Sequence, residues 1–180
     1  MTGDAIGDLR VDYQPPADGG RLVIEGRNYT DTGAGTYGMQ LPPYVASDGL
    51  LPGSSSRIVL TGLHNDFTAG STTDYDFVSL FGLVALGDGP VTVHAAAYDQ
   101  ADGSNFWSGD FTLNSSGYGH FLYIPTTGQY AAPQFAGHAA FNMVVSVTGG
   151  DGATPAAAFA TVKDTRSRDL VFIPGKSPSN

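Results

Sequence analysis

Cysteine is absent from the 180 residues of the chain, which excludes disulfides and thiolate metal sites. No run of about 18 or more uncharged apolar residues occurs, so the sequence predicts no membrane-spanning helix. The first twenty residues hold no apolar core of the kind that a signal peptide has, and we therefore predict no secretory signal there. Lysine and glutamate are also scarce, because the charged residues are 16 Asp, one Glu, six Arg and two Lys.

The charge composition disfavours one class of partner. The net charge is −9, whereas sequence-independent binding to nucleic acid needs clustered Lys and Arg, so we predict no nucleic-acid partner. Lys and Glu favour helices and Asp favours turns, so the composition suits an all-β protein with many loops. The same composition suits a halophilic protein with an acidic surface, and a GC-rich genome also produces part of it.

The remaining composition indicates a folded β protein with many turns. The chain has 19 Phe and Tyr residues, 25 Gly and 11 Pro, and it lacks any helical period of ten or more residues. Short β-rich runs alternate instead with Gly/Asp/Ser/Thr clusters. The runs are Arg21–Glu25, Tyr37–Leu41, Arg57–Leu63, Tyr75–Leu86, Pro90–Tyr98, Phe106–Leu113, Tyr118–Ile124, Ala139–Val147, Ala156–Val162 and Leu170–Ile173.

These runs predict one all-β domain, an antiparallel jelly-roll barrel or sandwich of about eight strands. We expect an N-terminal arm over residues 1–20, the β-barrel over 21–174 and a C-terminal tail over 175–180.

The stretch SNFWSGDFTLNSSGYGHFLYIP at positions 104–125 contains the only tryptophan. Period-2 alternation places Trp107, Phe111 and Leu113 on one face of the first strand, and Phe106, Asp110 and Thr112 on the other, mixed face. We predict that the two strands form an antiparallel hairpin across the NSSG turn. The alternative is that the stretch is a binding surface. The predicted hairpin core is Trp107, Phe111, Phe121 and Tyr123.

No recognised catalytic motif occurs. GxSxG, SxxK, HExxH and HxH are all missing, and the histidines at 64, 94, 120 and 138 have no partner at ligand spacing. The carboxylates Asp74, Asp76, Asp99, Asp102 and Asp110 lie mostly in predicted turns, where Asp bonds its own backbone. We predict no enzyme, no metal site and no cofactor, with a loop calcium ion left open as the alternative because oxygen ligands are plentiful.

Two further features are local. Asn28 and Asn114 each begin an N-glycosylation acceptor tripeptide, and Asn114 lies in the predicted hairpin turn. Half of the eight basic residues fall in the last eighteen positions, which predicts either docking on an acidic neighbouring subunit or anionic surface, or simply a final strand with a frayed end. These assembly-contact candidates are Lys163, Arg166, Arg168 and Lys176.

From RLVIE at Arg21 to LVFIP at Pro174, the size, strand number and Asp-rich, Lys-poor composition resemble one family of viral proteins. This family consists of the smaller single jelly-roll major capsid proteins of tailless icosahedral haloarchaeal viruses with an internal membrane. The resemblance implies an upright β-barrel in the virion, paired with a larger single jelly-roll partner in pseudo-hexameric capsomers over the membrane. The mild acidity also fits a bacteriophage capsid or decoration protein.

The competing function is a carbohydrate-binding β-sandwich, as a receptor-binding or decoration protein of a virus or phage. Such a protein needs exposed aromatic rings on which sugars can stack. The tryptophan is predicted to face inward, so the candidates on the outward face are Tyr98, Phe106, Tyr118 and Tyr130.

Overall fold

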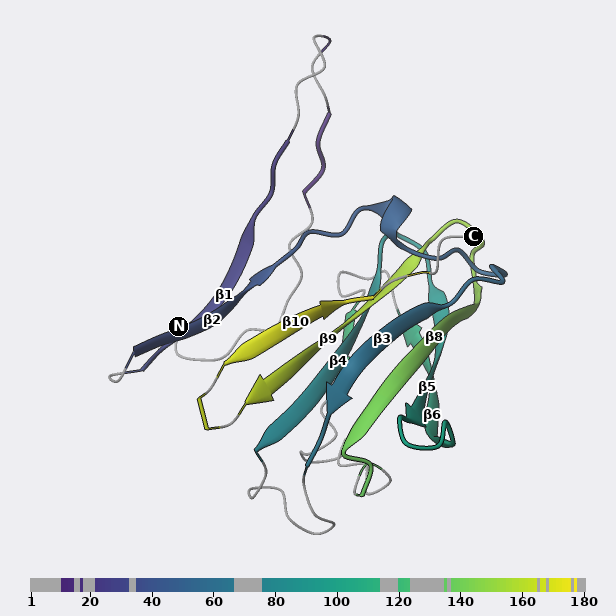
Figure 1. Cartoon of the computed structure of the whole chain (residues 1–180). Coiled ribbons are helices and arrows are strands. Elements are labelled where there is room, and N and C mark those ends of the chain that lie inside the picture. Colours follow the sequence, from purple (N-terminus) through teal and green to yellow (C-terminus); the bar gives the residue numbers. More distant parts are fainter. Residues whose placement is uncertain are drawn as a thin grey trace.

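Two four-stranded antiparallel sheets face each other, and a separate two-stranded hairpin lies beside them (Figure 1). The computed structural model describes residues 11–14, 17, 22–32, 35–66, 76–113, 120–123, 135, 137–164, 166–167, 169–175 and 177. All the strand pairs in these residues are antiparallel, and one short 3-10 helix, η1 (Ala46–Asp48), precedes the sandwich. The all-β prediction is confirmed at the level of a β-sandwich.

The first sheet, here called the β4 sheet, has the order β10-β9-β4-β7. Its strands are β4 (Phe77–Ala85), β7 (His120–Tyr123), β9 (Ala156–Asp164) and β10 (Leu170–Pro174). The second, the β5 sheet, has the order β3-β8-β5-β6. Its strands are β3 (Ile58–His64), β5 (Val91–Asp99), β6 (Asn105–Leu113) and β8 (Ala140–Gly150).

The hairpin outside the sandwich pairs β1 (Gly26–Thr32) with β2 (Gly35–Leu41). The sandwich strands run from Ile58 to Pro174. The predicted strand Arg21–Glu25 is wrong over its described residues, because residues 22–25 belong to no strand and β1 begins only at Gly26. Apolar content favoured that segment, but a strand also needs a partner, and the register with β2 supplies one only from Gly26 onward.

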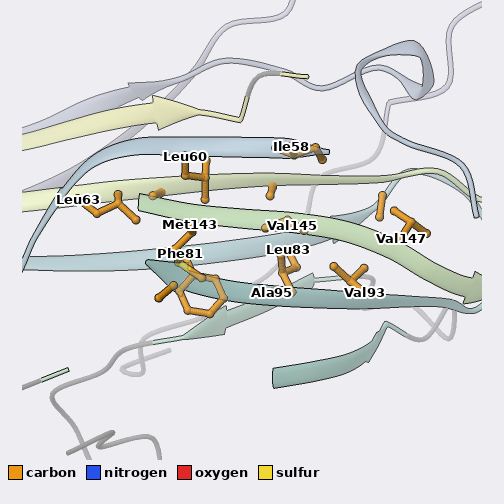
Figure 2. Close-up of a cluster of buried hydrophobic side chains, with 14 of the residues drawn as sticks. Ile58, Leu60, Leu63, Phe81, Leu83, Val93, Ala95, Met143, Val145 and Val147 are labelled. Carbon is orange, nitrogen blue, oxygen red and sulfur yellow. The ribbon is translucent and has the colours of Figure 1, made fainter. Parts of the chain in front are cut away.

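The core fills the space between the two sheets. Figure 2 shows side chains from β3, β4, β5 and β8 that meet there, among them Leu60, Leu83 and Met143, all with no exposed area. In β5 the residues at positions 91, 93, 95 and 97 are all fully buried, as the alternation of the sequence predicts. Each such Val or Leu side chain contributes about 1.5–3 kcal/mol through burial.

The pairing register of the β5 sheet shifts at three described places, the third of them between Thr92 and Val93 of β5, opposite Gly149 and Val147 of β8. The register of β3 against β8 shifts between Leu60 and Leu63, where Gly62 has a φ of 76° that side-chain-bearing residues rarely adopt. Leu60 and Leu63 both reach the core as a result. The second bulge lies where Ala97 pairs with Trp107 but Tyr98 pairs with Asn105, which leaves Phe106 as the extra residue.

The second bulge corrects a predicted position. Strict alternation placed Phe106 on the outward face, but it packs against the core, edge-to-face with Phe135 and Phe141 at centroid distances of 5.3 and 5.8 Å. An extra residue in one strand reverses the facing of the residues on one side of it, and period-2 counting alone does not detect such an insertion.

The predicted hairpin between positions 106–113 and 118–124 is wrong. β6 pairs with β5 along its length, whereas β7 pairs with β4 in the opposite sheet. β5 and β6 are joined by a short turn and form a long ladder, so β6 already has its partner on that side. Residues 114–119, with the NSSG turn, lie outside the described residues.

Candidate functional site

A polar cluster fastens the β5–β6 turn to the segment that precedes β8. His138 Nδ1 lies 2.6 Å from Asp99 Oδ2, and the His138 ring stacks on Phe106 with centroids 3.9 Å apart. The hydrogen bond from His138 lowers the pKa of Asp99, and the backbone N–H of Ala101 adds to the effect. Hydrogen bonds from Ser104 likewise lower the pKa of Asp102. These contacts hold the imidazole and the turn in place.

A second His–Asp pair lies on the outer face of the β5 sheet. His94 and Asp110 are register partners on β5 and β6, and His94 Nδ1 lies 2.8 Å from Asp110 Oδ1. The Asp110 side chain is 71% exposed, so solvent screens the pair and its contribution to stability is small. Thr92, Thr112 and Ser146 add polar groups to this face, and Ala96, Tyr98 and Val144 lie on it as well.

A buried amide joins β3 to β4, which belong to opposite sheets. Asn65 is 1% exposed and its Oδ1 accepts a hydrogen bond from the Ser79 backbone at 2.6 Å. The Ser79 hydroxyl donates to the carbonyl of His64 and accepts from its N–H. Within the part of the chain that the structure describes, Asn65 Nδ2 has no hydrogen-bond partner. Asn65 carries no signal in the sequence for this role, since a lone Asn at a strand end normally indicates a turn.

Two of the four C-terminal basic candidates, Lys163 and Arg166, lie among the described residues. Arg166 pairs with Asp76 of the same chain, with both N···O distances 2.5 Å. Lys163 is half-buried on β9, in register with Val78 and Leu170. Arg168 and Lys176 lie outside the described residues. Arg166 therefore has a carboxylate partner, Asp76, within its own chain. Its contact with a carboxylate of a neighbouring subunit stays a prediction.

The outer face of the β4 sheet is apolar, unlike that of the β5 sheet. Phe81 and Leu83 of β4 and Ala158 and Ala160 of β9 point into the core, so the residues between them point outward. The apolar face comprises Val78, Leu80, Gly82, Val84, Ala157, Phe159, Thr161, Leu170 and Phe172. Its larger side chains at 80, 84, 159, 170 and 172 are half-buried, and Lys163 lies at one end.

Two aromatic rings dominate this apolar face. Phe159 and Phe172 stack with centroids 5.4 Å apart and an interplanar angle of 17°. The Phe159 ring lies over Gly82, its register partner, at a place where any Cβ would overlap the ring. Glycine at 82 thus allows the ring to lie flat over the central strand. A sheet that is apolar on both faces is typical of sheets covered on both sides.

The β1–β2 hairpin lies against the edge of this sheet. Figure 1 shows it beside β10, and β2 contacts β10. After β2, Pro42 and Pro43 stiffen the chain, and the Tyr44 hydroxyl donates to the carbonyl of Ala158 at 3.4 Å. Burial raises the pKa of Tyr44 to about 12. The base of the hairpin is therefore fixed to β9.

The structure describes only some of the predicted glycan-contact and hairpin-core side chains. Tyr98 is half-buried on β5, while Tyr118 and Tyr130 lie outside the described residues. Trp107 and Phe111 are half-buried against the core, with Gly109 between their rings. Phe121 and Tyr123 lie in β7, and their side chains are outside the description.

The remaining sequence candidates are scattered. Asn28 lies in β1 and His120 in β7, whereas Asp74 and Asn114 are outside the described residues. Where side chains are described, no group of three His, Asp or Glu residues converges on a metal position. None of the helical segments described has the length and apolar character to cross a membrane.

No protein-family model, curated protein or solved structure matches the chain.

Proposed function

We propose that the protein is a structural subunit that acts by packing side by side with copies of itself or with a larger partner in a virion shell. The observation that carries the proposal is the apolar outer face of the β4 sheet. Phe159, Phe172 and Leu80 on this face are held in a rigid sheet and are only half-buried. Apolar surface of this kind, bordered by polar residues, is typical of protein interfaces.

Exposed apolar residues before the sandwich support the same proposal. Of the eight large hydrophobic residues that are exposed among the described ones, six precede β3. They include Leu22 and Val23, which is 78% exposed. Burial of such residues in an assembly would contribute about 25 cal/mol for each Å² removed from water.

The strand pairing supports a rolled topology within this proposal. β4 pairs with β9 and β5 pairs with β8, so two consecutive strands pair in reverse order with two later ones. A ribbon folded over into two sheets gives such nested pairs, which is why we propose the jelly roll as the finer description of the sandwich. A larger jelly-roll partner, the virion location and contact with an internal viral membrane are parts of the proposal that the sequence resemblance supplies.

The net charge gives the proposed assembly a salt dependence. Subunits with a net charge of −9 repel each other, and this repulsion is screened beyond about 10 Å at about 0.1 M salt. Contacts between apolar faces do not weaken with salt, and sulfate or phosphate salts strengthen them. High ionic strength should therefore favour the assembled state.

Light scattering of the full chain across a salt series tests the proposal. We expect the molar mass to rise from that of one chain to that of an oligomer as salt increases, and to fall again on dilution. A protein that stays monomeric at every salt concentration, both alone and with virion partners, contradicts the proposal. If that monomer also binds on a glycan array, the carbohydrate-binding function takes its place.

A further inference from the structure

We propose that the apolar face of the β4 sheet is the docking site for the arm of a second copy of this chain. Here the arm means β1, β2 and residues 22–25, which lead into β1, and not the N-terminal residues 1–20. The inference rests on the proposed function, because it names the partner and the surface of that assembly.

The arm contacts its own sandwich at the edge strand β10. It forms a two-stranded sheet with no strand pairing to the β4 or β5 sheet, and an isolated two-stranded hairpin is marginally stable at best in water. The residues that lead into it, Leu22 and Val23, are 45% and 78% exposed. In sequence, β2 alternates Tyr37, Met39 and Leu41 with Gly38 and Gln40, a pattern typical of a strand that has one face against an apolar surface.

The apolar face is the surface that fits this pattern. It offers Leu80, Val84 and the stacked rings of Phe159 and Phe172. The outer face of the β5 sheet instead presents the His94–Asp110 pair. A hairpin laid on the β4 sheet through the face of Tyr37, Met39 and Leu41 would bury them together with Asn28 and Thr30, the β1 residues opposite Met39 and Tyr37, as in the packing of one sheet on another at about 10 Å.

A second copy is the occupant because the hairpin of the same chain is held elsewhere. Pro42, Pro43 and the Tyr44–Ala158 hydrogen bond fix its base, and an antiparallel bridge between Leu50 and Ala156 fixes the segment that follows. From that base the hairpin runs beside β10, at the edge of the sheet (Figure 1). The large side chains of the apolar face stay half-buried in this arrangement.

Disulfide trapping tests the inference, because the chain has no cysteine of its own. One protein carries Met39→Cys in the arm, and a second, differently tagged, carries Val84→Cys on the apolar face. The control partner carries Thr112→Cys, which is exposed on the outer face of the β5 sheet. In salt that favours assembly, we expect the Met39/Val84 heterodimer to form at least about tenfold faster than the control, because docking raises the effective thiol concentration.

Two results would overturn the docking of the arm on a second copy, and a third would reject the proposed function. Equal trapping rates in a solution where light scattering shows oligomers would reject arm docking and leave assembly standing. An intrachain disulfide in a dilute double variant with both cysteines, without a heterodimer, would show that the arm docks on its own sheet. A monomer at every salt concentration, both alone and with virion partners, would reject the proposed function itself. If Val84→Cys lowers the melting temperature strongly, Phe172→Cys on the same face replaces it.

Discussion

The contact between Gly82 and Phe159 gives a sharp test of the β4 sheet. The two residues are register partners, and a Cβ at position 82 would overlap the Phe159 ring. Gly82→Ala must therefore displace the ring from its stack on Phe172. Overpacking of this kind costs about 1–3 kcal/mol of the free energy of unfolding. For a chain of this length that lowers the melting temperature by about 3–10 °C.

A double-mutant cycle separates this overlap from a general intolerance of alanine in the strand. Phe159→Ala removes the ring, so Gly82→Ala should cost nothing in that background, which gives a coupling energy of about 1–3 kcal/mol. The control is Gly149→Ala in β8, whose Cβ would lie 3.7 Å from Thr92, an ordinary contact. We expect it to stay within about 0.5 kcal/mol of wild type.

Urea denaturation followed by circular dichroism measures all four proteins of the cycle, under conditions in which light scattering gives a monomer. An equal loss from Gly82→Ala with and without the Phe159 ring would refute the reasoning. It would mean that the ring does not lie over Gly82 and that the register or the outward face of β9 is different.

Three further predictions concern the core and the ion pairs. Leu83→Ala, at a fully buried position, should cost about 2–5 kcal/mol in the same denaturation assay. The pKa of Asp99 is lowered by its bond with His138, so its stabilisation is present above the unfolded pKa and is lost as the pH falls below about 4. Wild type should lose more melting temperature on acidification than Asp99→Asn, and equal losses would contradict this. Arg166→Ala breaks an exposed pair with Asp76, so it should cost at most about 1 kcal/mol in the same denaturation assay.

The sequence predicted the elements of the sandwich better than their partners. Alternation in β5 identified its four positions with no exposed area, because the register shifts of its ladders insert the extra residues into the partner strands β6 and β8. Phe106 was assigned to the wrong face because a bulge is an insertion in pairing, and pairing is not visible in one strand alone. The same limit explains the wrong hairpin, since β6 and β7 are adjacent in sequence but pair in opposite sheets.

The candidate interface was only partly accessible from the sequence. β4 reads FVSLFGLVA, which is apolar at odd and even positions alike, and this pattern signals a strand covered on both faces. The sequence of β4 alone does not show which of its two faces points into the core, because the strands that pair with β4 determine this. The partner of Arg166 was equally inaccessible, because Asp76 lies ninety positions earlier in the chain.

The most direct test of the assembly proposal compares two neighbouring residues of β10. Phe172 lies on the apolar face and stacks on Phe159, whereas Val171 lies on the opposite side and is 60% exposed. Light scattering in high salt should give a monomer for Phe172→Ser and the wild-type oligomer for Val171→Ser, with circular dichroism showing both folded. Wild-type mass for a folded Phe172→Ser protein would contradict assembly through the apolar face.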